Sequence, residues 1–538
     1  MSHAPEPPES SVELVELRVL DGPNRFFTRP AVKLEFSGDE PGQADAVAAN
    51  AALAVKRLHS ALHLPEPRLT SRRSDDGLRS VIAFAWRRRT VSQVIGSAAA
   101  RLALKRSTER RELAALRATA HGPLAHLPKP RIPIVAVTGT NGKSTTTRLI
   151  AHVASESGLK VGMTNSDGIY VRGELVEAGD WTGFGGAARV LSEPELDLAV
   201  LETARGGILL RGIGYAANDV SVVTNVSADH LGLQGIDTVD ELAEVKGVVV
   251  RITRRGGWAV LNADDDRVWA MHRRTRANLY AFSMEPRSER VERALDGGGR
   301  AAVLDRGMLV LRAAGRRSRR VAPADELPVT VGGLSRYNIA NALAAAAACD
   351  ALGIAMARIR RGLRSFAQDA AANPGRLNLY ERRGVFALVD FAHNEAGLAG
   401  LMDVARAVAG RRKVRLAFGT AGDRTDEMLH GLGVLGGGAD DLVIAEKRQY
   451  LRGRDNDEMN ELLRIGARDG GYSGQVEALP SEQGAFGALL GRAKRGDVCA
   501  VMAHVERSEL FEWLATEGFK PVGTDRLREL VGRATEGV

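Results

Sequence analysis

The hydrophobic pattern is clearest in one stretch of the chain, where an apolar run, a glycine-containing turn and an amphipathic segment follow one another. Residues 132–137 are mostly apolar and β-branched, which is typical of a strand buried in a parallel sheet. Beyond the turn, Leu149, Ile150 and Val153 fall on one face of a helix. The pattern therefore predicts a strand, a turn and a helix N-terminus in direct succession.

Apolar runs separated by segments with helical spacing continue this pattern. They predict one parallel sheet with strands at 132–137, 160–163, 196–201, 220–226 and 258–261, and a second with strands at 385–394, 414–420, 441–447 and 497–502. A turn-forming segment, 373–376, separates the two sets. We therefore predict a central domain at 132–372 and a smaller domain at 373–538. Residues 286–326, rich in arginine and glycine, are predicted to be an excursion of short strands and basic loops.

The chain before these sheets has a mixed pattern. Two strands between residues 12 and 36 flank a turn at 21–24, and a helix at 43–62, a strand at 78–86 and a basic helix at 91–118 follow. These elements predict an N-terminal α+β module at 12–122. Prolines mark 123–131 as a linker, and the proline-containing segment 1–11 is predicted to be disordered.

Composition narrows the classes of function. A chain of 538 residues is too long for one hydrophobic core, and its 44% hydrophobic and 26% charged residues are typical of soluble globular proteins. The net charge of +8 indicates either solvated surface or attraction of an anionic partner. We expect no nucleic acid as partner, because no nucleic-acid module is evident and aromatic residues make up only 5%.

The cellular context follows from what the chain contains. Cys349 and Cys499 are too few for a disulfide framework or a structural zinc site. The first residues do not resemble a signal peptide, and no apolar run is long enough to span a membrane. A cytoplasmic protein without a membrane partner is expected.

The turn after the first strand reads GTNGKST and forms a phosphate cradle. Its backbone N–H groups converge on an anion at a helix N-terminus, where the helix dipole is favourable. Lys143 can reach the β- and γ-phosphates, and the Ser144 hydroxyl can lie on Mg²⁺. Val137 stands where the longer form of this motif has a further glycine, so this is the compact GxxGKS form. The residues predicted to bind a nucleoside triphosphate are Gly139, Thr140, Asn141, Gly142, Lys143, Ser144 and Thr145.

Polar residues follow several strands of the first predicted sheet, and ligands of such sheets gather at this edge. Glu202 ends one strand and is either a Mg²⁺ ligand or a loop carboxylate. Asp229 and His230 end another and form either a metal site or a hydrogen-bonded turn. Lys246 lies towards the apolar side of a helix. The usual interpretation of a lysine in a helix is a solvated side chain.

Two further groups of polar residues have open interpretations. Asn338 and Asn341 begin a helix and either read an adenine edge or cap the helix. The carboxyl ends of the C-terminal strands bring Asp390, His393, Asp423, Arg424, Arg452 and Arg454 to one edge. We expect the two edges to face each other, with the substrate between them and domain closure as the gate.

The ordered motifs resemble the Mur ligase superfamily of ATP-dependent amide-forming enzymes. They are GTNGKST, ETARGG, TNVSADHLG, VLNADD, NIANALAA, NPGRLN, DFAHN and GDR, between residues 132 and 505. The segments DGIYVRGELVEAGDWTG, LETARGGILLRG and AGDRTDEM are most similar to the Mur-like half of the cyanophycin synthetase branch. RVLDGPN, at 18–24, resembles the N-terminal domain of the same branch.

The resemblance implies roles for individual residues. Lys143 and the turn would hold ATP, with Ser144, Glu202 and His230 at Mg²⁺. Lys246 would be the active-site lysine, which is carbamylated in many members, and Arg376 an arginine at the phosphates. The expected catalytic residues are Lys143, Glu202, His230, Lys246 and Arg376. Asn338 would lie at adenine and Asp390 at ribose. The substrate residues would be Thr182, His393, Asn394, Asp423, Arg424, Arg452 and Arg454.

The implied reaction joins a carboxylate to an amine. ATP first converts a carboxylate of a peptide or amino-acid acceptor into an acyl phosphate, and an amino-acid amine then displaces phosphate. Cyanophycin synthetases also carry an ATP-grasp domain between the first module and the Mur-like half. This chain has no room for it there, so we expect a single addition step. A separate ATP-grasp enzyme is one conceivable partner, and homo-oligomerisation stays open.

Departures from the family pattern leave alternatives open. Phe391 replaces the usual tyrosine, and Lys447 stands where the branch commonly has an acidic residue, which puts the identity of the amine in doubt. The alternative enzymes are a poly-γ-glutamate-type or a muropeptide-type Mur ligase. The alternatives from other classes are a non-catalytic accessory that binds nucleotide and polymer, and a nucleic-acid-dependent ATPase suggested by the basic charge.

Overall fold

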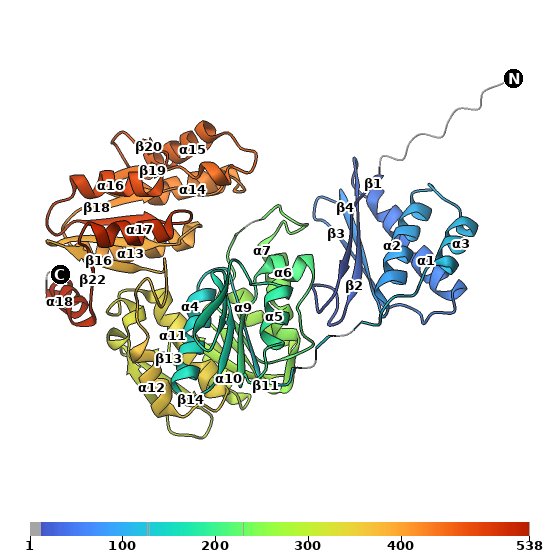
Figure 1. The fold of residues 1–538 in the computed structure, drawn as a ribbon, viewed down its shortest axis with the longest axis horizontal. Helices are drawn as coiled ribbons and strands as arrows, with labels where there is room; N and C mark the ends of the chain where they lie inside the picture. Colours follow the sequence, from blue (N-terminus) through green and yellow to red (C-terminus); the bar gives the residue numbers. More distant parts are fainter. Residues whose placement is uncertain (1–11, 126, 129, 230, 537–538) are drawn as a thin grey trace.

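Three sheets follow one another along the chain, each with its own helices (Figure 1). The computed structural model describes residues 12–125, 127–128, 130–229 and 231–536. The predicted α/β class is confirmed, with an α+β module first, a large parallel-dominated sheet next and a smaller α/β unit last. The predicted disorder of 1–11 lies outside the described residues, and the boundaries at residues 122, 131 and 372 stay predictions. No helix in the described part of the chain combines the length and apolarity needed to cross a bilayer.

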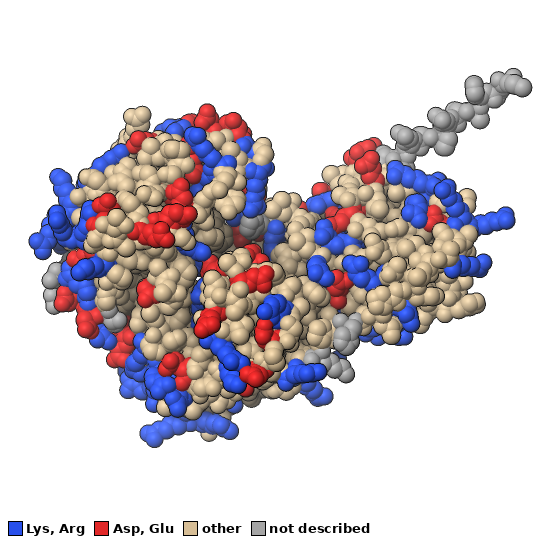
Figure 2. Space-filling model, in the orientation of Figure 1, with Lys and Arg blue, Asp and Glu red and all other residues tan. Residues whose placement is uncertain are grey.

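The charged surface is mixed. On the face shown in Figure 2, Lys and Arg side chains lie on all three lobes and alternate with Asp and Glu side chains. On this face, the distribution agrees with solvated surface as the origin of the positive net charge. The same view shows the molecule hollowed between the C-terminal lobe and the N-terminal lobe, above the central sheet.

The N-terminal sheet is antiparallel with strand order β1-β2-β4-β3, and helices pack on one of its faces (Figure 1). Its elements are β1 (Val12–Leu20), β2 (Ala31–Gly38), α1 (Gln43–Ala61), β3 (Leu69–Arg73), β4 (Arg79–Ala85), α2 (Arg89–Ala103) and α3 (Glu109–Ala118). The single basic helix predicted over 91–118 is wrong. Lys105 adopts a left-handed φ of 55°, which ends α2 and separates it from α3.

The central sheet has the order β15-β14-β13-β12-β11-β10-β5-β9-β6-β7-β8, and its strands run parallel from β13 to β6. Its strands are β5 (Ile134–Thr138), β6 (Val161–Thr164), β7 (Gly168–Val171), β8 (Glu174–Ala178), β9 (Leu198–Glu202), β10 (Asn218–Val223), β11 (Thr253–Asn262), β12 (Asn278–Ser283), β13 (Arg300–Asp305), β14 (Met308–Ala313) and β15 (Arg319–Pro323). Its helices are α4 (Lys143–Glu156), α5 (Phe184–Leu191), α6 (Arg205–Leu210), α7 (Val239–Lys246), α8 (Val248–Arg251), α9 (Asp266–Ala270), α10 (Glu289–Asp296), α11 (Arg336–Ala351) and α12 (Met356–Ser365).

The short strands predicted within 286–326 are present, but they extend the main sheet and do not form a separate excursion. β13 pairs in parallel with β12, and β14 and β15 continue the sheet in antiparallel fashion. Ala301, Ala302 and Val303 are buried in this extension.

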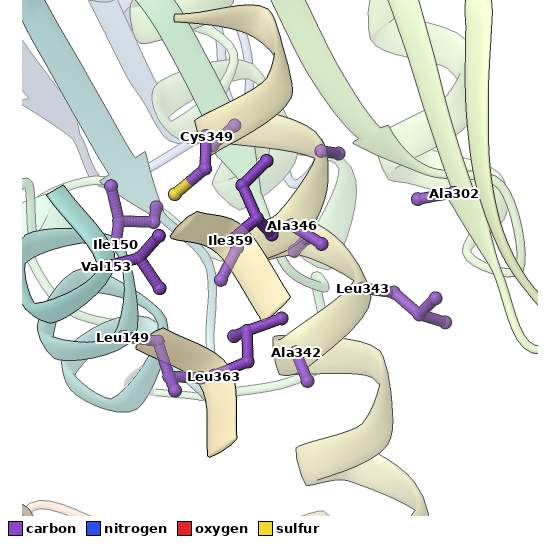
Figure 3. Close-up of a cluster of buried hydrophobic side chains, with 14 of the residues drawn as sticks. Leu149, Ile150, Val153, Ala302, Ala342, Leu343, Ala346, Cys349, Ile359 and Leu363 are labelled. Carbon is purple, nitrogen blue, oxygen red and sulfur yellow. The ribbon is translucent and has the colours of Figure 1, made fainter. Parts of the chain in front are cut away.

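Helix α11 organises the core of the central sheet unit. Its alanines are buried on every side, so the helix contacts strands on one side and α4 and α12 on the other. Figure 3 shows Leu149, Ile150 and Val153 of α4 facing Ile359 and Leu363 of α12, with α11 alongside. The small alanine side chains permit this close approach of the helices to each other and to the sheet.

The C-terminal sheet has the order β20-β19-β18-β21-β17-β16-β22, parallel from β20 to β17. Its strands are β16 (Asn378–Arg382), β17 (Val385–Asp390), β18 (Val414–Phe418), β19 (Asp441–Ala445), β20 (Glu477–Leu479), β21 (Val498–Met502) and β22 (Lys520–Pro521). Its helices are α13 (Glu395–Ala409), α14 (Asp426–Gly436), α15 (Asn456–Asp469), α16 (Glu482–Arg492), α17 (Arg507–Thr516) and α18 (Thr524–Glu536).

Truncating Leu343 tests the packing around α11. Its side chain has no exposed surface, so Leu343→Ala removes apolar contacts and leaves a cavity, which we expect to cost about 3 kcal/mol. Hydrogen exchange of the α11 amides under native conditions measures this loss. Leu175→Ala is the control, because Leu175 is 52% exposed, and equal destabilisation by the two substitutions would contradict the packing described.

Candidate functional site

The turn between β5 and α4 requires glycine at two positions. Gly139 and Gly142 have φ of 152° and 84°, which lie in the region that side chains rarely adopt. A Cβ on Gly139 would overlap the hydroxyl oxygen of Thr224, and one on Gly142 would overlap the amide oxygen of Asn341. The absence of both side chains therefore lets the backbone curve closely around an anion, as the sequence predicts.

The end of β10 fixes the tip of this turn. The N–H of Asn141 donates to the side-chain oxygen of Asn225 at 2.9 Å, and the Asn225 amide donates back to the Asn141 carbonyl at 3.0 Å. Thr224 donates its hydroxyl to the same carbonyl at 2.6 Å. The cradle is thus held from a neighbouring parallel strand.

Lys143 and Ser144 begin α4 directly behind the cradle. The Lys143 ammonium donates to the carbonyl of Thr140 at 2.7 Å, so it folds back over the turn. The Ser144 hydroxyl lies 3.3 Å from that of Ser166, at the end of β6. Both side chains therefore lie beside the turn, and their contacts with phosphate and a cation stay predictions.

Glu202 is a buried carboxylate beside this turn. It ends β9, the strand next to β5, and only 3% of it is exposed. Burial raises the pKa of its carboxyl, although Lys143, Ser144 and Arg376 favour the ionised form. Its Oε2 is buried and has no hydrogen-bond partner in the described part of the chain. A buried carboxylate oxygen without a hydrogen-bond partner, beside a predicted phosphate site, is a suitable ligand for a divalent cation.

The third residue predicted at the metal, His230, lies outside the described residues. Within the described ranges, no group of three or more His, Cys, Asp or Glu side chains is placed to hold a metal ion. Ser144 and Glu202 are therefore the predicted metal-binding residues whose positions the structure gives.

Lys246 is buried at the C-terminal end of α7, so the solvated-lysine interpretation is wrong. Its ammonium donates to the carbonyl of Gly139 at 2.6 Å. Burial, reinforced by the charge of Lys143, lowers the pKa of Lys246 to about 7. A substantial fraction of this side chain is therefore an uncharged amine at neutral pH.

Arg376 enters the site from the C-terminal unit. Its guanidinium donates to the Ser144 hydroxyl at 3.4 Å and lies 4.4 Å from the ring centroid of Phe391. Burial lowers its pKa, and Asp167 and Asp390 oppose that effect. The stacking on Phe391 fixes the planar cation with its edge towards the turn.

Asp390 holds the backbone around this arginine. Its carboxylate accepts the N–H of Leu377 at 2.8 Å and that of Ala392 at 2.7 Å. Burial raises the pKa of Asp390 to about 6. A contact with ribose stays a prediction.

The structure adds an ionic cluster that the sequence does not reveal. Asp167 pairs with Arg148 of α4 at 2.9 Å and with Arg507 of α17 at 2.5 Å. Burial alone would raise the pKa of Asp167, but the charges of Arg507, Arg376 and Arg148 outweigh it and lower the pKa. The aspartate follows β6 and so could have been suspected. Arg507 belongs to none of the recognised motifs, and only the folded chain brings it here.

A second contact joins the two α/β units at the tip of the turn. The side-chain amides of Asn141 and Asn394 donate to each other, both at 3.1 Å. The Asn394 oxygen also accepts the N–H of Gly397 at 2.9 Å and caps α13. The predicted substrate residue Asn394 thus contacts the phosphate-binding turn itself.

The edges of the two sheets meet again at Asp229. His393 lies 3.8 Å from its carboxylate and Arg424 lies 3.6 Å from it. Arg205 is close enough that Asp229 opposes the burial-driven lowering of the Arg205 pKa. A cluster of opposite charges therefore lines the space between the two units, beside the phosphate site.

The remaining predicted residues of the C-terminal unit lie next to this cluster. Arg452 pairs with Asp423, whereas Arg454 pairs with Asp426 at 2.7 Å and Glu458 at 2.9 Å, at the starts of α14 and α15. Arg454 also donates to the carbonyl of Arg424 at 3.0 Å, and Asp423 lies 3.4 Å from the Arg424 guanidinium, so these residues adjoin the Asp229 cluster.

Thr182 lies beside the ETARGG segment. Its hydroxyl donates to Asp180 at 2.6 Å, and its carbonyl accepts the N–H of Ala204 at 3.1 Å. The loop at 180–183 thus packs directly after Glu202, which places Thr182 near the Glu202 carboxylate.

The asparagines of α11 have a structural use. Asn338 donates its amide to the Val329 carbonyl at 2.8 Å and accepts from Asn341 at 3.0 Å. Ser335 caps the helix, so the capping interpretation of the asparagines is wrong. Asn341 also borders Gly142, which links this amide pair to the phosphate-binding turn. Adenine recognition by Asn338 stays a prediction.

Comparisons with known proteins point to one family. Family models of the Mur ligase middle domain and of the Mur ligase glutamate ligase domain match residues 137–349 and 375–505. The chain is 41% identical over 372 residues to the cyanophycin synthetase of Trichormus variabilis, and the match covers 69% of this chain and 41% of that protein. The chain thus spans about two fifths of the length of this relative.

A second relative and a solved structure agree with this match. The chain is 25% identical over 406 residues to UDP-N-acetylmuramoyl-L-alanyl-D-glutamate--2,6-diaminopimelate ligase of Geobacillus kaustophilus, covering 73% of this chain and 77% of that one. The structure of E. coli FolC in complex with ADP, without folate substrate, has a TM-score of 0.53 at 19% identity and covers 72% and 91% of the two chains. At that identity, the structural likeness shows the fold alone.

Replacing one glycine of the cradle tests its role. Gly142→Ala strains the backbone and obstructs the turn, so we expect binding of a non-hydrolysable ATP analogue to weaken by at least about tenfold in calorimetry. Gly158→Ala is the matched control, because Gly158 also has a left-handed φ, of 98°, but lies beyond the other end of α4 with open space around it. Equal affinities for the two variants would contradict the assignment.

Proposed function

Because this chain belongs to the Mur ligase family, we propose that it is an ATP-dependent ligase that joins a carboxylate to an amine in a single addition step. The observation that supports this most strongly is the convergence of Lys143, Glu202, Lys246 and Arg376 on one glycine turn. The cations of Lys143 and Arg376, which come from separate elements beside a buried carboxylate, suit a triphosphate and its metal ion.

ATP would bind with its phosphates on the turn between β5 and α4. Lys143 would leave the Thr140 carbonyl and reach the β- and γ-phosphates, while Arg376 would approach them from the opposite side. A divalent cation held by Ser144, Glu202 and His230 would supply further neutralisation of phosphate charge when bound.

The first chemical step would be attack of an acceptor carboxylate on the γ-phosphorus, which gives an acyl phosphate and ADP. Two anions must approach each other in this step, and Lys143 and Arg376 offset their repulsion. Phe391 lies against the face of the Arg376 guanidinium, and Asp390 fixes the backbone at Leu377. Neither contact occupies the edge of the guanidinium that would bind phosphate. The residues therefore act mainly through charge and position.

The second step would be attack of an amine on the acyl carbon, followed by loss of phosphate and formation of an amide. The cluster of Asp229, His393 and Arg424 lies between the two units, where the amine would enter. Asp229 would attract the ammonium of an incoming amino acid, and Arg424 its carboxylate. Closure of the two units would exclude water, which otherwise hydrolyses the acyl phosphate.

The substrates are proposed to be those of a cyanophycin-synthetase-like single addition, with a peptide or amino-acid carboxylate as acceptor. The relative from Trichormus variabilis is a cyanophycin synthetase, but this chain matches only 41% of it. Helix α3 ends at Ala118 and β5 begins at Ile134, so the segment between the N-terminal and central sheets is too short for an ATP-grasp domain. An ATP-grasp partner enzyme would supply any alternating addition.

Buried Lys447 suggests that the incoming amine is not selected at this position. Lys447 forms an ion pair with Glu482, both side chains being 1% exposed, and donates to the Met502 carbonyl at 2.9 Å. Glu482 also accepts the N–H groups of the loop that follows β21. The Lys447 ammonium is therefore paired within the C-terminal unit. We propose that the Asp229 cluster determines which amine is accepted.

The direct test is phosphate release from Mg-ATP with paired substrates. β-Aspartyl peptides, γ-glutamyl peptides and a UDP-muropeptide are each combined with single amino acids. We expect release that needs one acceptor and one amine together, and a loss of at least about 100-fold in Lys143→Ala.

Measured ATP binding without release by any pair would contradict the ligase proposal and favour an accessory that binds nucleotide and polymer. Release that depends on DNA or RNA instead would indicate a nucleic-acid-dependent ATPase.

The lowered pKa of Lys246 predicts carbamylation, which requires the uncharged amine. With a pKa of about 7 instead of 10.5, the uncharged fraction rises as the pH increases through neutrality. Carbon-13 NMR with labelled bicarbonate should therefore show a carbamate signal that grows from about pH 6 to about pH 8. Lys246→Arg keeps a positive charge and should lose the signal; a signal that persists in this variant would assign it to another amine.

A further inference from the structure

The RVLDGPN segment has no role in the reaction described above, yet it forms a close junction with the central unit. The N–H groups of Asp21 and Gly22 both donate to the Arg211 carbonyl, at 2.7 and 3.2 Å. The N–H of Ile213 donates to the Pro23 carbonyl at 2.8 Å. A Cβ on Gly22 would overlap the Ile213 carbonyl oxygen, so glycine is needed for this backbone-to-backbone contact.

The side chain of the asparagine in this segment shapes the turn, and its hydrogen bonds lie within residues 22–29. Asn24 is fully buried, and its oxygen accepts the N–H groups of Phe26 and Phe27 at 2.9 and 3.0 Å. Its amide donates to the carbonyls of Gly22 and Arg29, both at 2.9 Å. This network fixes the backbone on either side of Arg25.

Arg25 projects from this turn onto helix α7. Its guanidinium donates to Glu241 at 2.7 Å and to Glu244 at 3.3 Å, and only 7% of the arginine side chain is exposed. The N-terminal unit adds Arg72, which also pairs with Glu244, and Arg79, which pairs with Asp237 just before the helix. Glu241 and Glu244 of α7 thus form ion pairs with arginines of the N-terminal unit.

Glu241 is also part of the capping box that begins α7. The Thr238 hydroxyl accepts the Glu241 N–H at 3.2 Å, while the second oxygen of Glu241 accepts the N–H of Thr238 at 3.3 Å and that of Asp237 at 2.8 Å. Arg25 therefore binds the carboxylate that fixes the start of the helix. The same helix ends at Lys246, which donates to the phosphate-binding turn.

We propose that Arg25 is a positioning residue for the ligase reaction proposed above: through Glu241 and Glu244 it sets the position of α7 and hence of Lys246. The helix has 8 residues and is about 12 Å long, so it transmits a shift of its start to its end nearly rigidly. Loss of the guanidinium leaves the partly buried carboxylate of Glu241 without its arginine and removes one of the cations that pair with Glu244. The N-terminal unit is then a structural part of the active site, and RVLDGPN is its point of attachment.

Arg25→Met in the full chain tests this proposal, because methionine keeps much of the aliphatic volume without the charge. We expect kcat to fall by at least about tenfold while the Kd for ATP changes by less than about twofold. Hydrogen exchange should become faster in peptides covering 237–247 and stay unchanged in those covering α11. Arg25→Lys, which retains a cation, should recover part of the kcat.

Arg57→Met is the control, because Arg57 lies in the same unit with 56% of its side chain exposed and pairs only with the exposed Glu109 among the described residues. A kcat equal to that of this control would overturn the proposal. Faster exchange throughout the chain would also overturn it, since that indicates general destabilisation. If the wild-type chain shows no activity with any substrate pair, the proposed function fails, but local exchange at 237–247 still decides whether Arg25 positions α7.

Discussion

Positive charges crowd into one buried space, and the arrangement of the central and C-terminal units around it depends on this constraint. Lys143 and Lys246 come from the central unit and Arg376 from the C-terminal unit, with Glu202 as the buried carboxylate between them. Burial is the main cause of the lowered pKa values of Lys246 and Arg376, so placing these cations in the protein interior is unfavourable. A bound triphosphate would offset the cost of burying these cations, which supports the proposal that the site takes an anion.

This charge arrangement requires that the two sheets present their carboxyl edges to each other. The amides of Asn141 and Asn394 join the edges at the tip of the phosphate turn, and Arg507 joins them through Asp167. Each contact pairs a residue of the nucleotide site with a residue of the opposite unit. Movement between the units would therefore change the nucleotide site directly, which gives domain closure a physical connection to catalysis.

The local parts of the site were predictable from the sequence because short-range patterns determine them. The apolar run before Gly139, the glycines of the turn and the helix after Lys143 predict the cradle, and the position of Glu202 at a strand end predicts its approach to the turn. The α/β class followed for the same reason. Lys246 and Arg376 were added by the resemblance to the Mur ligases, because spacing alone predicts a solvated lysine at the first position and only a domain boundary at the second.

Long-range contacts and the limits of elements were not predictable in this way. Arg507 reaches Asp167 only because the fold brings α17 beside the end of β6, and no local pattern marks it. The left-handed Lys105 divides a helix whose composition is continuous. Strands β13 to β15 extend the main sheet, although arginine-rich turns make their sequence resemble an excursion. These features depend on tertiary packing, which overrides local preference.

The most direct test of the central claim follows the oxygen atoms of the acceptor. The acceptor carboxylate is labelled with a heavy oxygen isotope, and the released phosphate is analysed by mass spectrometry after a turnover with ATP and the amine. An acyl phosphate leaves one acceptor oxygen on the phosphorus when the amine displaces it, so the account predicts one labelled oxygen in each phosphate released. Amide formation with unlabelled phosphate would contradict the account, because the carboxylate would then have been activated in another way.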